Sequence, residues 1–243
     1  MPDAFSESAR CCALQPQPSA RSAARCREWP DPSNGPGRIQ RTVEEFGIRE
    51  VFVVYSGHGV PDLRQSEPTP AYLLPSDGLP FSPEATAYPL DLLLENLGKL
   101  PVEHVTVILD ACFSSNTDTK TGLAAKLAPG ISAATLPPEP EARVSVLAAT
   151  GPGRDKFAAW LEPQRHGAFT WHLLQGLYGK ADRDSDGRVT LAEASSYTRT
   201  QVRLDVRQRP DGLVQTPTLR SDRPGHELTV FDLETQPVFS PLA

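Results

Sequence analysis

The chain has 243 residues, of which 39% are hydrophobic, and a formal net charge of −6 at pH 7. This length and apolar content suffice for a folded domain with a sizeable core. The acidic balance leaves no basic stripe, so nucleic acid is not an expected partner. No apolar run reaches the roughly 18 residues of a membrane span, and the amino terminus lacks the pattern of a secretory signal. We therefore expect a cytoplasmic protein with no membrane partner.

Three of the four cysteines lie close together in the sequence, and the fourth lies far from them. Cys11, Cys12 and Cys26 are crowded near the amino terminus, whereas Cys112 stands apart from them. A disulfide framework is typical of short exported chains, which this chain does not resemble in length or in its amino terminus. We therefore expect the thiols to be reduced.

The amino-terminal residues differ in composition from the rest of the chain. Residues 1–37 mix Ser, Ala, Arg and Pro with scarcely any apolar period, which predicts a disordered or poorly packed lead. Residues 38–243 are expected to form the folded domain. Its first element is a short amphipathic helix from Arg38 to Gly47, because apolar residues recur there at helical spacing and the glycine favours a helix end.

The next elements alternate between strand and helix. Val51–Tyr55 is an apolar run typical of a buried strand, and a helix with leucines on one face follows at 90–97. Two further buried strands are predicted at 105–109 and 144–148. A strand, a helical crossover and a second strand form the βαβ unit of a parallel sheet, so the fold class is α/β.

The carboxyl-terminal third is predicted to be mostly helical. A helix from about Phe169 to Tyr178 is followed by an acidic loop and by a helix through Val202, and the last strand is expected at 228–231. Residues 115–142, rich in Ser, Thr and Pro, are expected to be exposed and open to cleavage.

Two reactive side chains follow neighbouring predicted strands. His58 lies between two glycines after the strand 51–55, and Cys112 follows the strand 105–109. Open parallel sheets bind ligands at the carboxyl ends of their strands, where both residues belong. A nearby imidazole favours the thiolate form of a cysteine, so this pair predicts a nucleophile and its base. The backbone N–H groups of Gly59 and Cys112 are the expected donors to the oxyanion of an acyl-transfer reaction.

The motifs around these residues resemble a known family. Tyr55–Gly59, Tyr72–Asp77 and Leu109–Ser114 are similar to the catalytic core of bacterial caspase-like and metacaspase-like peptidases, and Cys112 lies 54 positions after His58, close to the caspase spacing of about 50. Segments His166–Thr170 and Gln215–Pro217 extend the resemblance over roughly residues 50–220. The resemblance implies a three-layer caspase-like fold and a cysteine endopeptidase in which His58 is the general base or acid and Cys112 the nucleophile.

Substrate preference is suggested by a carboxylate two residues before the cysteine. Residues i and i+2 of a strand share a face, so Asp110 is expected on the side of Cys112, where it would pair with an Arg or Lys side chain. The arrangement resembles metacaspases and clostripain-like enzymes, which cut after basic residues. Asp155 is a second, weaker candidate, and Asp110 could instead cap a neighbouring loop.

A second motif lies between the two carboxyl-terminal helices. Residues 182–193 fit the twelve-residue EF-hand loop, with glycine at position six. The expected calcium ligands are Asp182, Asp184, Asp186, the Arg188 carbonyl, Thr190 and Glu193. The alternative is a polar turn whose aspartates cap the second helix without metal. No cofactor is expected for the peptidase chemistry itself.

The resemblance has one gap. Caspase-like domains usually carry two more strands before the histidine strand, and the short segment before Val51 holds no recognisable equivalents. The strand Val51–Tyr55 would then have an uncovered apolar edge. Two hypotheses follow: a cysteine endopeptidase acting on proteins or peptides, or a catalytically impaired caspase-like module that acts by binding, with or without calcium. The sequence leaves the oligomeric state open.

Overall fold

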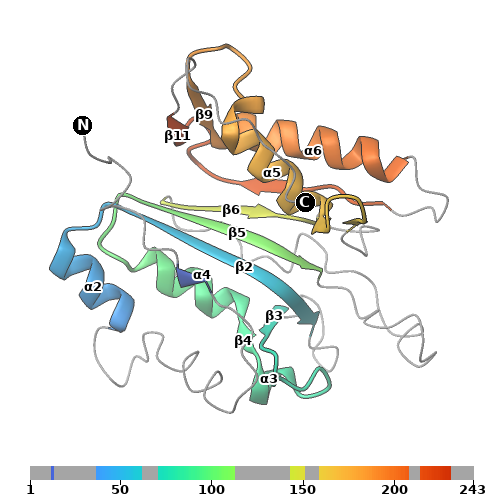
Figure 1. The fold of residues 1–243 in the computed structure, drawn as a ribbon. Helices are drawn as coiled ribbons and strands as arrows, with labels where there is room; N and C mark the ends of the chain where they lie inside the picture. Colours follow the sequence, from blue (N-terminus) through green and yellow to red (C-terminus); the bar gives the residue numbers. More distant parts are fainter. Residues whose placement is uncertain are drawn as a thin grey trace.

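The computed structural model describes residues 37–61, 71–112, 143–150, 159–207 and 214–230, together with the backbone of Cys12–Ala13 (Figure 1). The strands are β1 (Cys12–Ala13), β2 (Glu50–Pro61), β3 (Ala71–Leu74), β4 (Tyr88–Pro89), β5 (His104–Cys112), β6 (Val144–Ala148), β7 (Trp160–Leu161), β8 (His166–Gly167), β9 (Arg188–Thr190), β10 (Thr218–Arg220) and β11 (Glu227–Val230). The helices are α2 (Arg38–Phe46), α3 (Pro83–Thr86), α4 (Leu90–Gly98), α5 (Ala168–Gln175), the π-helical turn η3 (Gly176–Lys180) and α6 (Leu191–Arg207).

A mostly parallel core of strands organises the central sheet. The strand order is β10-β6-β5-β2-β3-β4, with β2, β5 and β6 parallel to one another. The pairing of β2 with β5 runs from Glu50 opposite His104 to His58 opposite Cys112. Helix α4 lies in the connection between β2 and β5, as the predicted βαβ unit requires. The α/β fold class predicted from the sequence is confirmed.

The sheet is covered by helices on both faces, which gives three layers (Figure 1). One core joins α2 and α4 to the odd-numbered residues of β5, from Val105 to Ala111, all of which are buried. The other core packs α5, β9 and α6 on the opposite face, where Ile108 and Leu147 contribute from the sheet. This alternation follows from the period of two along a strand and places the even-numbered positions of β5 under α5 and α6.

The helices lie where the sequence predicts them, but not all of them end at the predicted residue. Helix α2 ends at Gly47, whose φ of 59° is left-handed, as predicted. The helix predicted to reach Tyr178 instead ends as α5 at Gln175 and continues as η3, where Gly179 has a φ of 103°. In the described part of the chain, no helix combines the length and apolarity needed to cross a membrane.

Two strands at the carboxyl-terminal side differ from expectation. The predicted last strand forms as β11, but it pairs antiparallel with β9 outside the central sheet. The strand that completes the central sheet is β10, antiparallel to β6, and the sequence analysis did not find it. Its three residues are too few for an alternating pattern to be detected.

The outer edge of β2 was expected to be uncovered. Strand β1 pairs with it in parallel, with Cys12 opposite Val53 and Ala13 opposite Val54. The expectation is therefore wrong over these two residues. The pairing places part of the predicted amino-terminal lead against the strand that carries His58.

β2 extends well beyond the strand 51–55 that the sequence predicts. β2 continues through Pro61, and its last four residues pair antiparallel with β3. The Tyr55 hydroxyl reaches the carbonyl oxygens of His58 and Leu74, at 2.8 and 2.9 Å. A Cβ at position 57 would lie 2.8 Å from that hydroxyl oxygen. Gly57 is therefore required for the tyrosine side chain to extend past position 57 and hold the backbone carbonyl of His58.

We predict that Gly57→Ala destabilises the protein, because the added methyl group displaces the Tyr55 hydroxyl from both carbonyls. The expected loss is about 1–3 kcal/mol of unfolding free energy, the usual range for overpacking. Gly225→Ala is the matched control: a Cβ there meets no atom within 4 Å, and its φ lies outside the left-handed region. Urea denaturation of both variants measures the difference, and equal stabilities would contradict the assignment.

A histidine pair lies at the opposite end of the strands. The His104 side chain is 2% exposed, and its ring stacks on that of His226 with centroids 3.8 Å apart. Neither ring nitrogen of His104 has a hydrogen-bond partner within the described residues. Burial, with added repulsion from His226 and Arg223, lowers the pKa of His104 to about 4. His104 is therefore neutral in the folded protein at neutral pH.

This burial predicts a loss of stability in acid. The folded pKa of His104 is about 4, against 6.5 for an ordinary histidine, so the unfolded chain binds a proton that the folded chain excludes between these values. Stability is full above pH 6.5 and falls by roughly 3 kcal/mol as the pH drops to 4. Comparing the denaturation free energy of the wild type and His104→Leu from pH 4 to 7 tests this. Identical slopes in the two proteins would refute it.

Candidate active site

His58 and Cys112 come together through the sheet itself. They form the last register pair of β2 and β5, at the carboxyl ends of two adjacent parallel strands. Such strands are roughly 4.8 Å apart, and register partners in a parallel pair belong to the same face. His58 is exposed, with its backbone carbonyl held by Tyr55. For Cys112 the structure describes the backbone, and residues 113–142 lie outside the described part.

Asp110 lies on the face of the sheet that α5 covers. The hydroxyl of Thr170 donates a hydrogen bond to its Oδ2 atom. A Cβ on Gly167 would approach the same oxygen to 3.1 Å. Burial raises the pKa of Asp110, and the hydrogen bonds from the Thr170 side chain and backbone oppose that rise. Asp110 is thus a partly buried carboxylate two positions before Cys112 on the same strand.

The roles of the other residues predicted for this site stay predictions. Gly59 is buried within the β2–β3 pairing, opposite Leu73. Its role as an oxyanion donor stays a prediction, as does that of the Cys112 N–H. Asp155 lies outside the described residues, so its relation to Asp110 also stays a prediction.

Gln215 is a structural residue whose role the sequence analysis missed. Its side chain is 1% exposed, Oε1 accepts from the Ala159 N–H at 2.7 Å, and Nε2 donates to the Ala149 carbonyl at 3.0 Å. The amide therefore links the chain just after β6 to the chain just before β7. In the sequence, these two points lie on either side of Asp155. The sequence signal is the segment Gln215–Pro217, in which the resemblance assigns no role to the glutamine.

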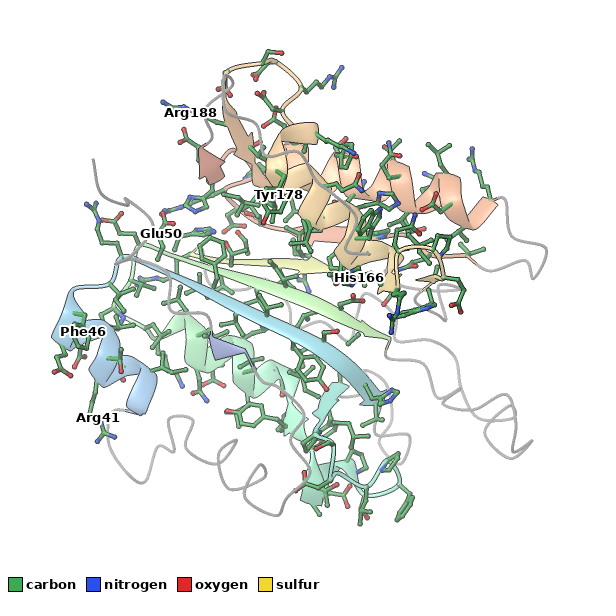
Figure 2. All side chains as sticks on the ribbon, viewed as in Figure 1. Arg41, Phe46, Glu50, His166, Tyr178 and Arg188 are labelled. Atoms are coloured by element: carbon green, nitrogen blue, oxygen red, sulfur yellow. The ribbon has the colours of Figure 1, made fainter. Side chains whose placement is uncertain are left out.

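Thr170 was missed in the same way. It lies in the first turn of α5, directly after β8, where the rings of His166 and Trp171 stack with centroids 5.9 Å apart. Figure 2 shows His166 beside the carboxyl ends of the central strands. The segment His166–Thr170 thus reaches the site from the helix layer, and sequence spacing gives no sign that its threonine meets Asp110.

The acidic loop forms a compact turn away from the strand ends. The carboxylates of Asp182, Asp184 and Glu193 offer ligand atoms within 4.8 Å of one another. Gly187, at position six, has a φ of 82°, which suits the sharp turn of a calcium loop. The Asp182 carboxylate accepts the backbone N–H of Asp186 and Gly187, at 3.2 and 3.0 Å.

Other predicted ligands of that loop have protein partners. The Asp186 carboxylate accepts the Arg188 N–H at 2.8 Å, and the Thr190 hydroxyl donates to Glu193 at 2.8 Å. Burial alone would raise the pKa of Glu193, but hydrogen bonds from Thr190 and Arg183 outweigh it and lower the pKa. Glu193 is therefore held as a carboxylate, and the chemistry of the donor set fits calcium.

The comparison with protein families agrees with this arrangement. The model of the caspase domain matches residues 41–228, more than half of the chain and both strand ends that carry His58 and Cys112. No curated protein matches the chain. The layered sheet and its flanking helices confirm the expected caspase-like α/β fold. The chain therefore belongs to the caspase domain family.

Proposed function

We propose that the protein is a cysteine endopeptidase in which Cys112 is the nucleophile and His58 the general base. The observation that carries the proposal is the register of β2 and β5, which pairs these two residues at the carboxyl ends of adjacent strands. Membership of the caspase domain family supports protein or peptide substrates.

The reaction follows from the roles of the two residues. His58 takes the thiol proton of Cys112, and the sulfur attacks the carbonyl carbon of the scissile peptide bond. The negative charge on the carbonyl oxygen is stabilised by the N–H groups of Gly59 and Cys112, each contributing roughly 3 kcal/mol. His58 then gives its proton to the departing amine, which leaves an acyl-enzyme. Water, deprotonated by His58, attacks the acyl group and restores the thiol.

Basic side chains before the scissile bond are the proposed preference. Asp110 is a partly buried carboxylate two positions before Cys112 on the same strand. A guanidinium forms bidentate, charge-assisted hydrogen bonds with such a group, and a buried carboxylate gains most from a cationic partner. Asp155 is the proposed second contact.

The activity is tested with fluorogenic peptides that carry Arg, Lys or Asp before the cleaved bond. We expect the wild type to cleave the Arg and Lys peptides, and Cys112→Ala and His58→Ala each to lower kcat/KM by at least a thousandfold, since the dyad acts as a unit. Cys26→Ala is the control and keeps full activity. Cleavage that persists in Cys112→Ala would contradict the assignment.

A catalytically impaired binding module is the alternative function. The rate at which iodoacetamide labels Cys112 at pH 6–7, measured by peptide mass mapping, distinguishes the peptidase from the binding module. A thiolate favoured by His58 reacts much faster than an ordinary thiol, and His58→Ala removes the difference. Labelling of Cys112 at the rate of a free thiol, with no response to His58→Ala, would favour the alternative.

We also propose that residues 182–193 bind one calcium ion, through Asp182, Asp184, Asp186, the Arg188 carbonyl, Thr190 and Glu193. Two observations support this: the full twelve-residue spacing of the motif and the approach of three carboxylates within 4.8 Å. Bringing these charges together costs free energy without a cation, so calcium would stabilise the hairpin between η3 and α6.

Calcium is therefore expected to raise the melting temperature of the wild type. Binding to the folded state alone stabilises it by about 2.7 kcal/mol when free calcium is a hundred times the Kd. Glu193→Gln should lose most of this response, while Glu84→Gln, an exposed carboxylate on α3, should keep it. A melting temperature unchanged up to millimolar calcium would end the proposal.

A further inference from the structure

The Asp110 carboxylate contacts the first turn of helix α5 through Thr170. Thr170 is the third residue of α5, so its backbone N–H belongs to the first turn, where the helix supplies no acceptor. The residue before the helix, Gly167, has no side chain to cap that turn. Asp110 accepts the Thr170 hydroxyl and is also influenced by its backbone N–H. A strand residue thereby caps the helix in place of a local side chain.

The space around the carboxylate is equally restricted. A Cβ at position 167 would meet Asp110 Oδ2 at 3.1 Å, closer than an ordinary van der Waals contact. Gly167 has a φ of −61° and a ψ of 139°, a conformation that any residue adopts. The glycine is therefore needed for room beside Asp110 and not for its backbone angles.

We propose that Thr170 is a positioning residue for substrate recognition: its hydroxyl, with the space left by Gly167, orients the Asp110 carboxylate toward a basic side chain of the substrate. This inference rests on the proposed peptidase function and deepens it. A carboxylate has about four acceptor positions, so the contacts with Thr170 leave capacity for a guanidinium or ammonium group. Because the carboxylate is already oriented, substrate binding loses less conformational entropy.

The same contact controls the charge of Asp110. Burial favours the neutral acid, whereas both hydrogen bonds from Thr170 favour the anion that a basic side chain requires. At this end of the neighbouring elements the titratable residues are His58 of β2, His166 of β8 and Cys112 of β5 itself. His172 of α5 is paired with Asp205 of α6 at 2.6 Å, and Glu50 and His104 lie at the other end of β2 and β5. Removing the Thr170 hydroxyl therefore raises the pKa of Asp110, and binding of a basic substrate weakens at a higher pH than in the wild type.

The test compares Thr170→Val, which keeps the shape and removes the donor, with Thr170→Ser, which keeps the donor. Peptides carrying arginine or its uncharged analogue citrulline before the cleaved bond serve as substrates. Thr170→Val should raise KM for the arginine peptide about tenfold, the size expected for one charge-assisted hydrogen bond, and leave kcat and the citrulline peptide nearly unchanged. The acid limb of kcat/KM should move to higher pH, and Thr170→Ser should restore both properties.

Three further variants sharpen the comparison. Gly167→Ala crowds the carboxylate without removing a donor and should also raise KM for the arginine peptide. Asp110→Asn should abolish the discrimination between arginine and citrulline. Thr200→Val makes the same change on the exposed side of α6, where the hydroxyl bonds to the Ser196 carbonyl, and should alter neither KM nor the pH profile.

The outcomes separate this inference from the proposed function. An active wild type whose KM and acid limb are unaffected by Thr170→Val refutes the positioning role and leaves the peptidase function standing. A wild type that cleaves no peptide refutes the peptidase function. In that event the pKa of Asp110, measured by NMR on protein labelled with ¹³C at the aspartate carboxyl carbon, is decisive. An equal pKa in the wild type, Thr170→Val and Thr170→Ser refutes the link between Thr170 and Asp110.

Discussion

The parallel pairing of β2 with β5 is the constraint on which the rest of the structure depends. Nine successive register pairs fix which residues lie opposite one another at the carboxyl ends, and a shift by one residue would move each side chain of a strand to the other face. The buried odd-numbered residues of β5 oppose such a shift, because they fill the core beneath α4. The register that pairs His58 with Cys112 is thus fixed by apolar residues along the whole length of β5.

The sequence predicted those parts of the fold that depend on local pattern. Apolar runs located β2, β5 and β6, and leucines at helical spacing located α4. Strand β10 escaped notice because three residues carry no period, and β11 was found but its partner was not predicted. Local sequence does not encode a strand's partner, which here is set by the packing of β9 between η3 and α6.

For the site, the sequence predicted the candidate reactive and acidic residues but not the residues that contact and support them. His58, Cys112 and Asp110 stand in short motifs, so their types and spacing were sufficient to select them. Thr170 and Gln215 act on residues more than fifty positions away, through contacts that exist after folding. The sequence also did not predict why position 57 must be glycine, since nothing in it shows that the Tyr55 ring lies against that position.

The strand-derived cap on α5 has a consequence for the order of assembly. An eight-residue helix is marginal in water by itself, and the hydroxyl of the third residue of this one, Thr170, bonds to a strand of the central sheet. The helix is therefore stable after β5 has joined the sheet, and Asp110 is oriented after the helix has formed. Under the proposed function, a partly folded chain would therefore lack an oriented carboxylate for the basic side chain of a substrate.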